Sequence, residues 1–114
     1  MYALLDRGIG LRPELAVKLR GTVVFRFDEG FAPLLVRFGE EIITVSDEDC
    51  EDPDLTIFGP LPGVVHFATA PQFGGIPNPA TGEGRKALRS FVSGRVRIEG
   101  ELTLARSLLM LLAL

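Results

Sequence analysis

"SGRVRIEGELTLARSLLMLLAL" (Ser93–Leu114) occupies the last part of the sequence and combines the features that decide its fold. Val96 and Ile98 alternate with charged residues, which is the period of a strand with one buried face. Gly100 follows as a turn, and from Leu102 the sequence becomes rich in leucine with the spacing of a helix. The stretch therefore predicts a strand that leads through a glycine into a C-terminal helix.

The predicted C-terminal helix has an apolar last turn. At about 100° per residue, the polar side chains of Thr103, Arg106 and Ser107 fall within one third of the helical wheel. Met110 and Leu114 fall in the same sector, so the last turn has no polar side. Leaving large apolar side chains in water forgoes ~1.5 to 3 kcal/mol each. We therefore expect this end to be covered by the protein's own loop, a second subunit, a lipid surface or a bound apolar ligand.

The middle of the chain has the alternation of antiparallel strands. Residues Thr22–Phe27 place apolar side chains on every second position, and Leu34–Phe38 and Ile42–Val45 follow after short turns. We predict a three-stranded meander from this spacing. An acidic connection, Asp47–Asp54, precedes a fourth predicted strand, Leu55–Gly59.

Three short helical segments are predicted beside these strands. Pro13–Leu19 begins with proline at a first-turn position and continues with good helix formers. Val64–Ala70 is predicted as a short buried helix and Ala87–Val92 as a further helical turn. Between them, Pro71–Lys86 carries three prolines and four glycines and is predicted to be loop.

Length and composition limit the class of protein. A chain of 114 residues fits one domain, 1–114, which can bury a real core. With 46% hydrophobic residues and a net charge of -3, the composition is that of a globular protein and gives no sign of nucleic-acid binding. Met1–Leu5 lacks the features of a signal peptide, and Cys50 is the only cysteine, so we expect a cytoplasmic protein. The apolar stretch from Leu102 is shorter than the ~20 residues that a membrane-spanning helix needs.

The order of these segments, with "DLTIFG" at Asp54–Gly59 and "FVSGRVRIEGELTLARSLLML" at Phe91–Leu111, resembles the sterol carrier protein type 2 domain. The resemblance extends over Leu19–Leu112 and is most specific in Gly94–Leu109. It implies an α+β fold with a five-stranded, mainly antiparallel sheet and helices packed on one face. It also implies an apolar tunnel for fatty acyl chains, sterols or other lipids, with the C-terminal helix at its mouth. Small bacterial relatives include accessory proteins of ubiquinone synthesis and accessory domains of larger enzymes. The longer Pro71–Lys86 connection implies a mouth that is shaped or capped differently.

The sequence offers a set of apolar side chains that could line such a tunnel. Eight phenylalanines with one tyrosine and no tryptophan supply large apolar surface with few polar tips. The candidate ligand-binding residues are Phe25, Phe27, Val36, Phe38, Phe67, Phe73, Phe91, Leu104, Leu108 and Leu111. The alternative is that they fill a solid core, in which case the protein is an interaction or dimerisation module without a ligand.

Catalytic and metal chemistry finds little support in the sequence. His66 is the only histidine, which excludes a histidine cluster, and the acidic residues around Cys50 disfavour its thiolate. The acidic connection lacks the spacing of an EF-hand loop. "TGEGRK" (Thr81–Lys86) has no Gly-Lys pair and therefore fails the P-loop pattern. We predict no catalytic residues, no metal and no cofactor.

The expected partner is a hydrophobic small molecule or lipid. Two further contacts are kept as hypotheses. One is transient contact of Arg85, Lys86 and Arg89 with an anionic membrane, and the other is a homodimer through the C-terminal helix. The arginines of the predicted strands alternate with acidic residues and form no basic stripe for nucleic acid.

Overall fold

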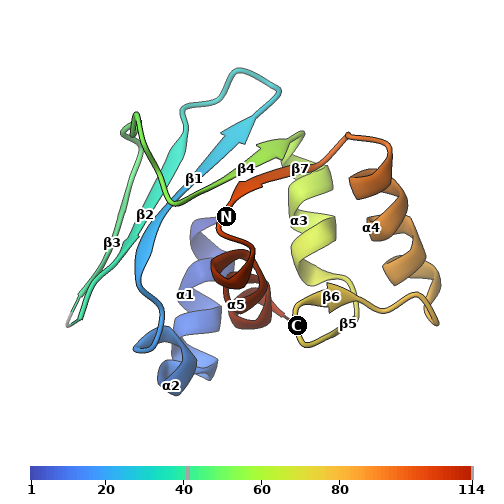
Figure 1. The fold of residues 1–114 in the computed structure, drawn as a ribbon, viewed down its shortest axis with the longest axis horizontal. Helices are drawn as coiled ribbons and strands as arrows, with labels where there is room; N and C mark the ends of the chain where they lie inside the picture. Colours follow the sequence, from blue (N-terminus) through green and yellow to red (C-terminus); the bar gives the residue numbers. More distant parts are fainter. Residues whose placement is uncertain (41, 114) are drawn as a thin grey trace.

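The computed structural model describes residues 1–40 and 42–113 and arranges them as a sheet with helices against one face (Figure 1). The strands of the main sheet are β1 (Gly21–Phe27), β2 (Leu34–Phe38), β3 (Ile43–Ser46), β4 (Leu55–Gly59) and β7 (Arg97–Gly100). The helices are α1 (Tyr2–Leu11), α2 (Pro13–Ala16), α3 (Leu61–Thr69), α4 (Gly82–Val92) and α5 (Leu102–Leu112). A small hairpin pairs β5 (Gln72–Phe73) with β6 (Ile76–Pro77).

The main sheet is mixed, with the order β3-β2-β1-β4-β7. The predicted meander is confirmed, because β1 pairs antiparallel with β2 and β2 with β3. β4 then lies parallel to β1, with Val23 opposite Leu55, and β7 lies antiparallel to β4. The predicted fold class, α+β with a five-stranded, mainly antiparallel sheet, is confirmed, with one parallel pair at its centre.

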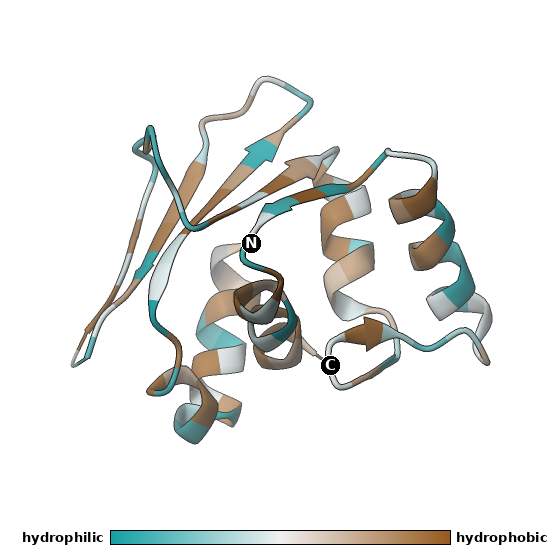
Figure 2. Ribbon diagram, viewed as in Figure 1, coloured by the Kyte–Doolittle hydropathy of each residue, from teal (hydrophilic) through white to brown (hydrophobic). Residues whose placement is uncertain are grey.

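One face of the sheet carries the core. Val23 and Phe25 of β1, Val36 of β2 and Leu55 and Ile57 of β4 are all buried in a single hydrophobic cluster with the helices. Figure 2 shows hydrophobic residues on the strands and on α3 and α5, whereas the outer side of α4 and the connections are more hydrophilic. The alternation read from the sequence is therefore the alternation between the helix-covered face and the outer face.

The acidic connection between β3 and β4 crosses the outer face of the sheet. It must pass β2 and β1, because β3 is the edge strand and β4 lies beyond β1. Two carboxylates fasten it to β1: Asp49 forms an ion pair of 2.6 Å with Arg26, and Asp54 accepts a hydrogen bond from the backbone N–H of Thr22. Val24, on the same face of β1 as Arg26, is fully buried. The connection is thus part of the packed structure.

The N-terminal helix α1 covers the apolar end of α5. The sequence analysis did not predict α1. Of the four partners expected to cover the apolar end of α5, the one most similar to α1 is a loop of the protein itself. Gly8 of α1 packs directly against the backbone of Leu111, which is fully buried. Arg7 donates a hydrogen bond of 2.9 Å to the carbonyl of Leu112, and Arg12 donates one of 2.9 Å to that of Ala113. The two guanidinium groups satisfy carbonyls that a helix leaves unpaired at its C-terminal end. Leu114 lies outside the described residues.

Several boundaries differ from the sequence prediction; α3, for example, begins at Leu61 instead of Val64, and β3 is shifted by one residue. Helix α4 begins at Gly82 instead of residue 87, because the Thr81 hydroxyl accepts a hydrogen bond from the Gly84 N–H as an N-cap. The predicted loop 71–86 therefore holds the start of α4 as well as the β5–β6 hairpin. The predicted helix over 13–19 is regular only to Ala16, after which the chain passes through a turn into β1.

Candidate functional site: an apolar groove beside a polar hollow

An apolar groove of about 310 Å³ lies between α3, α4, α5, β7 and the β5–β6 hairpin. Its lining is apolar except for one charged side chain, that of Arg106. The lining residues are Phe67, Gly75, Ile76, Pro77, Leu88, Phe91, Ile98, Leu102, Ala105, Arg106 and Leu109. Leu102, Ile76 and Phe91 of this lining are exposed, so the groove is open to solvent along part of its length. Figure 1 shows α4 and α5 on opposite sides of this region, with β7 and the hairpin at its two ends.

The spacing of side chains on the helices builds the walls of the groove. Leu88 and Phe91 stand three positions apart on α4, and Leu102, Ala105 and Leu109 share one face of α5. The Phe91 ring lies 6.0 Å from the Phe67 ring of α3, centroid to centroid, in a tilted arrangement. Such a lining favours an aliphatic or ring-containing ligand with little polar surface.

Arg106 is the charged side chain of the groove. Its Nε donates a hydrogen bond of 2.6 Å to the carbonyl of Gly74, at the turn of the hairpin. Gln72 donates a second hydrogen bond, 3.0 Å long, from its Nε2 to the carbonyl of Leu109 on α5. The hairpin is therefore held against α5 by two side-chain hydrogen bonds.

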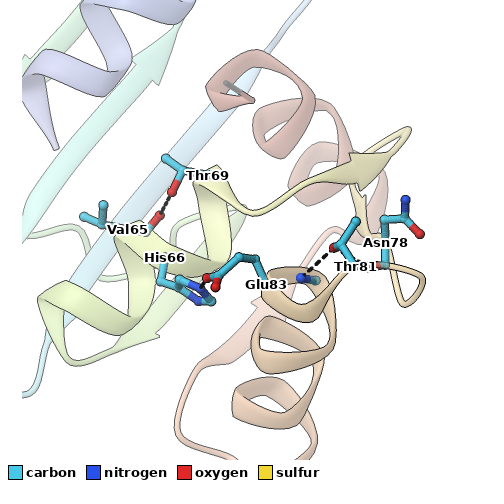
Figure 3. Close-up of polar contacts among 7 residues, drawn as sticks. Val65, His66, Thr69, Asn78, Thr81 and Glu83 are labelled. Carbon is cyan, nitrogen blue, oxygen red and sulfur yellow. Dashed lines mark hydrogen bonds and ion pairs between the residues drawn. The ribbon is translucent and has the colours of Figure 1, made fainter.

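A second, more polar hollow of about 560 Å³ lies on the other side of the hairpin, with His66, Thr69, Gln72, Glu83 and Ala113 among its lining. Figure 3 shows His66 of α3 and Glu83 of α4 pointing toward one another, with 2.5 Å between Nε2 and Oε2. The hydrogen bond from His66 lowers the pKa of Glu83 below its ordinary value of 4.5, and the nearby charge of Lys86 lowers it further. This hollow therefore presents an ionised carboxylate.

The structure places the predicted site residues in four environments. Phe67 and Phe91 line the groove, and they are the two predicted residues that it brings together there. The residues that are buried in the core between the sheet and the helices are Phe25, Val36, Phe38, Leu104, Leu108 and Leu111. Phe27 is half-buried beside Phe25 and Phe31 and borders a separate hollow, and Phe73 is 70% exposed on the hairpin. Ligand contact by these ten residues stays a prediction.

The sequence analysis missed most of the groove lining. Leu88, Ile98, Leu102, Ala105 and Leu109 were assigned to helices or a strand without a role in ligand binding. Leu88 and Phe91 both lie in the predicted helical turn Ala87–Val92, and their spacing of three positions could have indicated a common face. No pattern in the sequence indicates that the hairpin turns back onto α5.

Among residues 1–40 and 42–113, no three His, Cys, Asp or Glu side chains gather as ligands for a metal ion. In that part of the chain, no helix has the length and apolar character to cross a bilayer.

Several solved structures share this arrangement. A UbiJ-SCP2 ubiquinone synthesis protein is 18% identical, with a TM-score of 0.62 over 96% of this chain and 79% of that one. The sterol carrier protein domain 2 of Helicoverpa armigera is 21% identical, with a TM-score of 0.62 over 97% of this chain and 83% of that one. The fold is that of a sterol carrier protein type 2-like domain. The resemblance read from the sequence is thereby confirmed at the level of the fold.

The same sterol-carrier-like fold also matches part of a larger enzyme. The stereoselective inverting sec-alkylsulfatase from Pseudomonas sp. is 13% identical, with a TM-score of 0.61, over 89% of this chain but only 14% of the sulfatase. No family model matches the sequence, and no curated protein sequence is significantly similar to it. The likeness is therefore one of architecture.

Proposed function

We propose that this sterol-carrier-like domain binds a hydrophobic ligand, such as a fatty acyl, isoprenoid or sterol-like lipid, in the apolar groove, as a carrier or accessory protein. The observation that carries the proposal is a lining of ten apolar or glycine residues and one arginine, on a fold shared with sterol carrier domains. Burial of ~10 methylene groups at ~0.8 kcal/mol each would drive binding without a cofactor. The groove volume of about 310 Å³ lies at the lower end of the range of about 300 to 1,000 Å³ for small-molecule sites.

The proposal includes no catalytic step. His66 is engaged by Glu83, and Cys50 lies in the acidic connection on the opposite face of the sheet from the groove. A single cysteine, which can form no disulfide within the chain, also supports the expected cytoplasmic location. Contact of Arg85, Lys86 and Arg89 with a membrane stays a prediction.

The test is ligand binding by the purified protein and by two neighbouring variants. Native mass spectrometry followed by solvent extraction reports any lipid that co-purifies, and titration with the neutral dye Nile red reports the groove directly. Phe91→Asp places a carboxylate in the groove and is expected to weaken dye binding at least tenfold. Val92→Asp is the matched control, because Val92 follows on α4, is 83% exposed and does not line the groove.

The outcomes separate the proposal from its alternative. Equal dye binding by both variants, or none by the wild type, would refute the groove as the site. A dimer without lipid, even after incubation with mixed lipids, would favour the interaction module. The buried face of α5 is already occupied by the chain's own core and by α1, so a dimer through α5 would have to use exposed residues such as Leu102 and Met110.

A further inference from the structure

The β5–β6 hairpin separates the groove from the polar hollow. Residues Ala70, Pro71 and Gln72 line the hollow, whereas Gly75, Ile76 and Pro77 line the groove. The pair Gln72 and Pro77, opposite one another in the hairpin, thus face different cavities. The same division runs through α3, where consecutive residues His66 and Phe67 line the hollow and the groove. The hairpin and α3 therefore each contribute residues to both the polar and the apolar cavity.

Two side-chain hydrogen bonds fasten the hairpin to α5, and Gly75 and Pro77 are its buried residues. Its two large apolar side chains, Phe73 and Ile76, are 70% and 55% exposed and contribute little burial. Its turn, Gly74 and Gly75, has positive φ angles of 54° and 87° and rests on Arg106: a Cβ on Gly75 would come within 2.5 Å of the Arg106 carbonyl oxygen. We call the hydrogen bonds from Arg106 to Gly74 and from Gln72 to Leu109 the latch. Segments with little apolar burial and exposed polar contacts are the first to open locally.

We propose that the hairpin is a movable partition, and that breaking the latch joins the groove and the hollow into one site for a long-chain amphiphile with a hydroxyl-bearing head group. This inference rests on the proposed function and names its ligand class. The alkyl chain would occupy the groove and continue past the displaced hairpin, and the head group would reach the hollow. A short chain would fit the groove with the hairpin in place.

The chemistry of the hollow selects the head group. The Glu83 side chain is 61% exposed, and its Oε2 is bonded to His66, so Oε1 can accept a hydrogen bond from a ligand. A hydroxyl group donates to such an oxygen without bringing a second negative charge close to it. Joined, the two cavities lie well within the range of volumes that hold small-molecule ligands.

The ligand test compares chain lengths in a latch variant. Arg106→Met removes the hydrogen bond to Gly74 and keeps an apolar side chain on the groove wall. We expect monopalmitin, measured by displacement of Nile red, to bind about three- to tenfold more tightly to this variant, the effect of one net hydrogen bond on the opening equilibrium. Monocaprylin, whose chain requires no opening, measures the direct effect of the more apolar groove wall, and its affinity should rise less than that of monopalmitin. Arg37→Met, at an exposed position on β2, is the control and should change neither affinity.

Amide hydrogen exchange tests the latch without any ligand. The Asn78 N–H, which donates to the Pro71 carbonyl across the base of the hairpin, should exchange about three- to tenfold faster in Arg106→Met than in the wild type. Unchanged exchange at Asn78, or an equal gain in affinity for both monoacylglycerols, would overturn the partition. A wild-type protein that binds neither the dye nor the monoacylglycerols would refute the proposed function and the ligand class, whereas exchange at Asn78 would still decide the latch.

Discussion

Two glycines of helix α1 offer a matched test of how this helix packs on α5. Gly8 is buried, and a Cβ built there would overlap the backbone carbonyl oxygen of Leu111 and lie 3.2 Å from the Cγ atom of the Leu111 side chain. Gly10, half a turn further along the same helix, has no atom within 4 Å of a Cβ. We predict that Gly8→Ala destabilises the protein and that Gly10→Ala stabilises it.

The magnitudes follow from two opposing effects. Replacing glycine by alanine inside a helix stabilises it by about 1 kcal/mol at both positions, because alanine has less conformational freedom to lose. At Gly8 the added methyl group also forces α1 away from α5, and overpacking of this kind costs about 1 to 3 kcal/mol. The helix-propensity gain cancels in the difference between the two variants, so that difference, about 1 to 3 kcal/mol, measures the steric effect at Leu111 alone.

Urea unfolding followed by circular dichroism measures both free energies, and thermal unfolding provides a second reading. For a domain of this size, 1 kcal/mol corresponds to about 4 °C in Tm. We expect the Tm of Gly10→Ala to lie about 4 to 12 °C above that of Gly8→Ala. Equal stabilisation by both substitutions would show that α1 does not approach α5 at Leu111, and the account of how the apolar end of α5 is covered would be wrong.

Two further predictions concern the polar groups around the hollow. In His66→Ala the pKa of Glu83 should rise toward its ordinary value, because the hydrogen bond that lowers it is lost; carboxyl NMR titration of both proteins measures this. Identical carboxyl titration curves for the wild type and His66→Ala would contradict the role of His66. Because the folded-state pKa of Glu83 is lowered, the contribution of Glu83 to stability is complete above pH 4.5 and is lost as the pH falls through the folded-state pKa. Thr81→Ala should lower the free energy of unfolding by about 1 kcal/mol through loss of the N-cap bond to Gly84, and an unchanged urea midpoint would exclude that role.

The strands were the most predictable part of the fold. Leu34–Phe38 and Leu55–Gly59 have the predicted bounds, and β1 starts one residue earlier than predicted. Alternation of apolar and polar residues indicates which side of a strand is buried, so each strand can be predicted from its own residues alone. The parallel pairing of β1 with β4 is different, because it depends on the path of the connection across the outer face, and alternation carries no information on strand order.

The helices were harder to predict where tertiary contacts override local preference. Glycines at positions 8 and 10 obscure the pattern of α1, yet Gly8 is what allows this helix to approach Leu111. Gly84 makes the first turn of α4 look like a loop in the sequence. Glycine is needed there because a Cβ at that position would collide with the carbonyl of Asn78. The groove was missed because it depends on tertiary contacts. One wall, Gly75, Ile76 and Pro77, belongs to a hairpin inside the predicted loop, and only Phe67 and Phe91 of the lining were identified in advance.

The pairing of α1 with α5 has a consequence for how the protein is made. Residues 2–11 emerge from the ribosome about 90 residues before residues 102–112, which at about 5 to 20 residues per second is an interval of roughly 5 to 20 s. During that time Leu5, which is buried in the finished protein, has no α5 to pack against, and Arg7 and Arg12 lack their carbonyl acceptors. Helix α1 is thus synthesised well before its partner and docks late, and the nascent chain carries an uncovered apolar segment until α5 is complete.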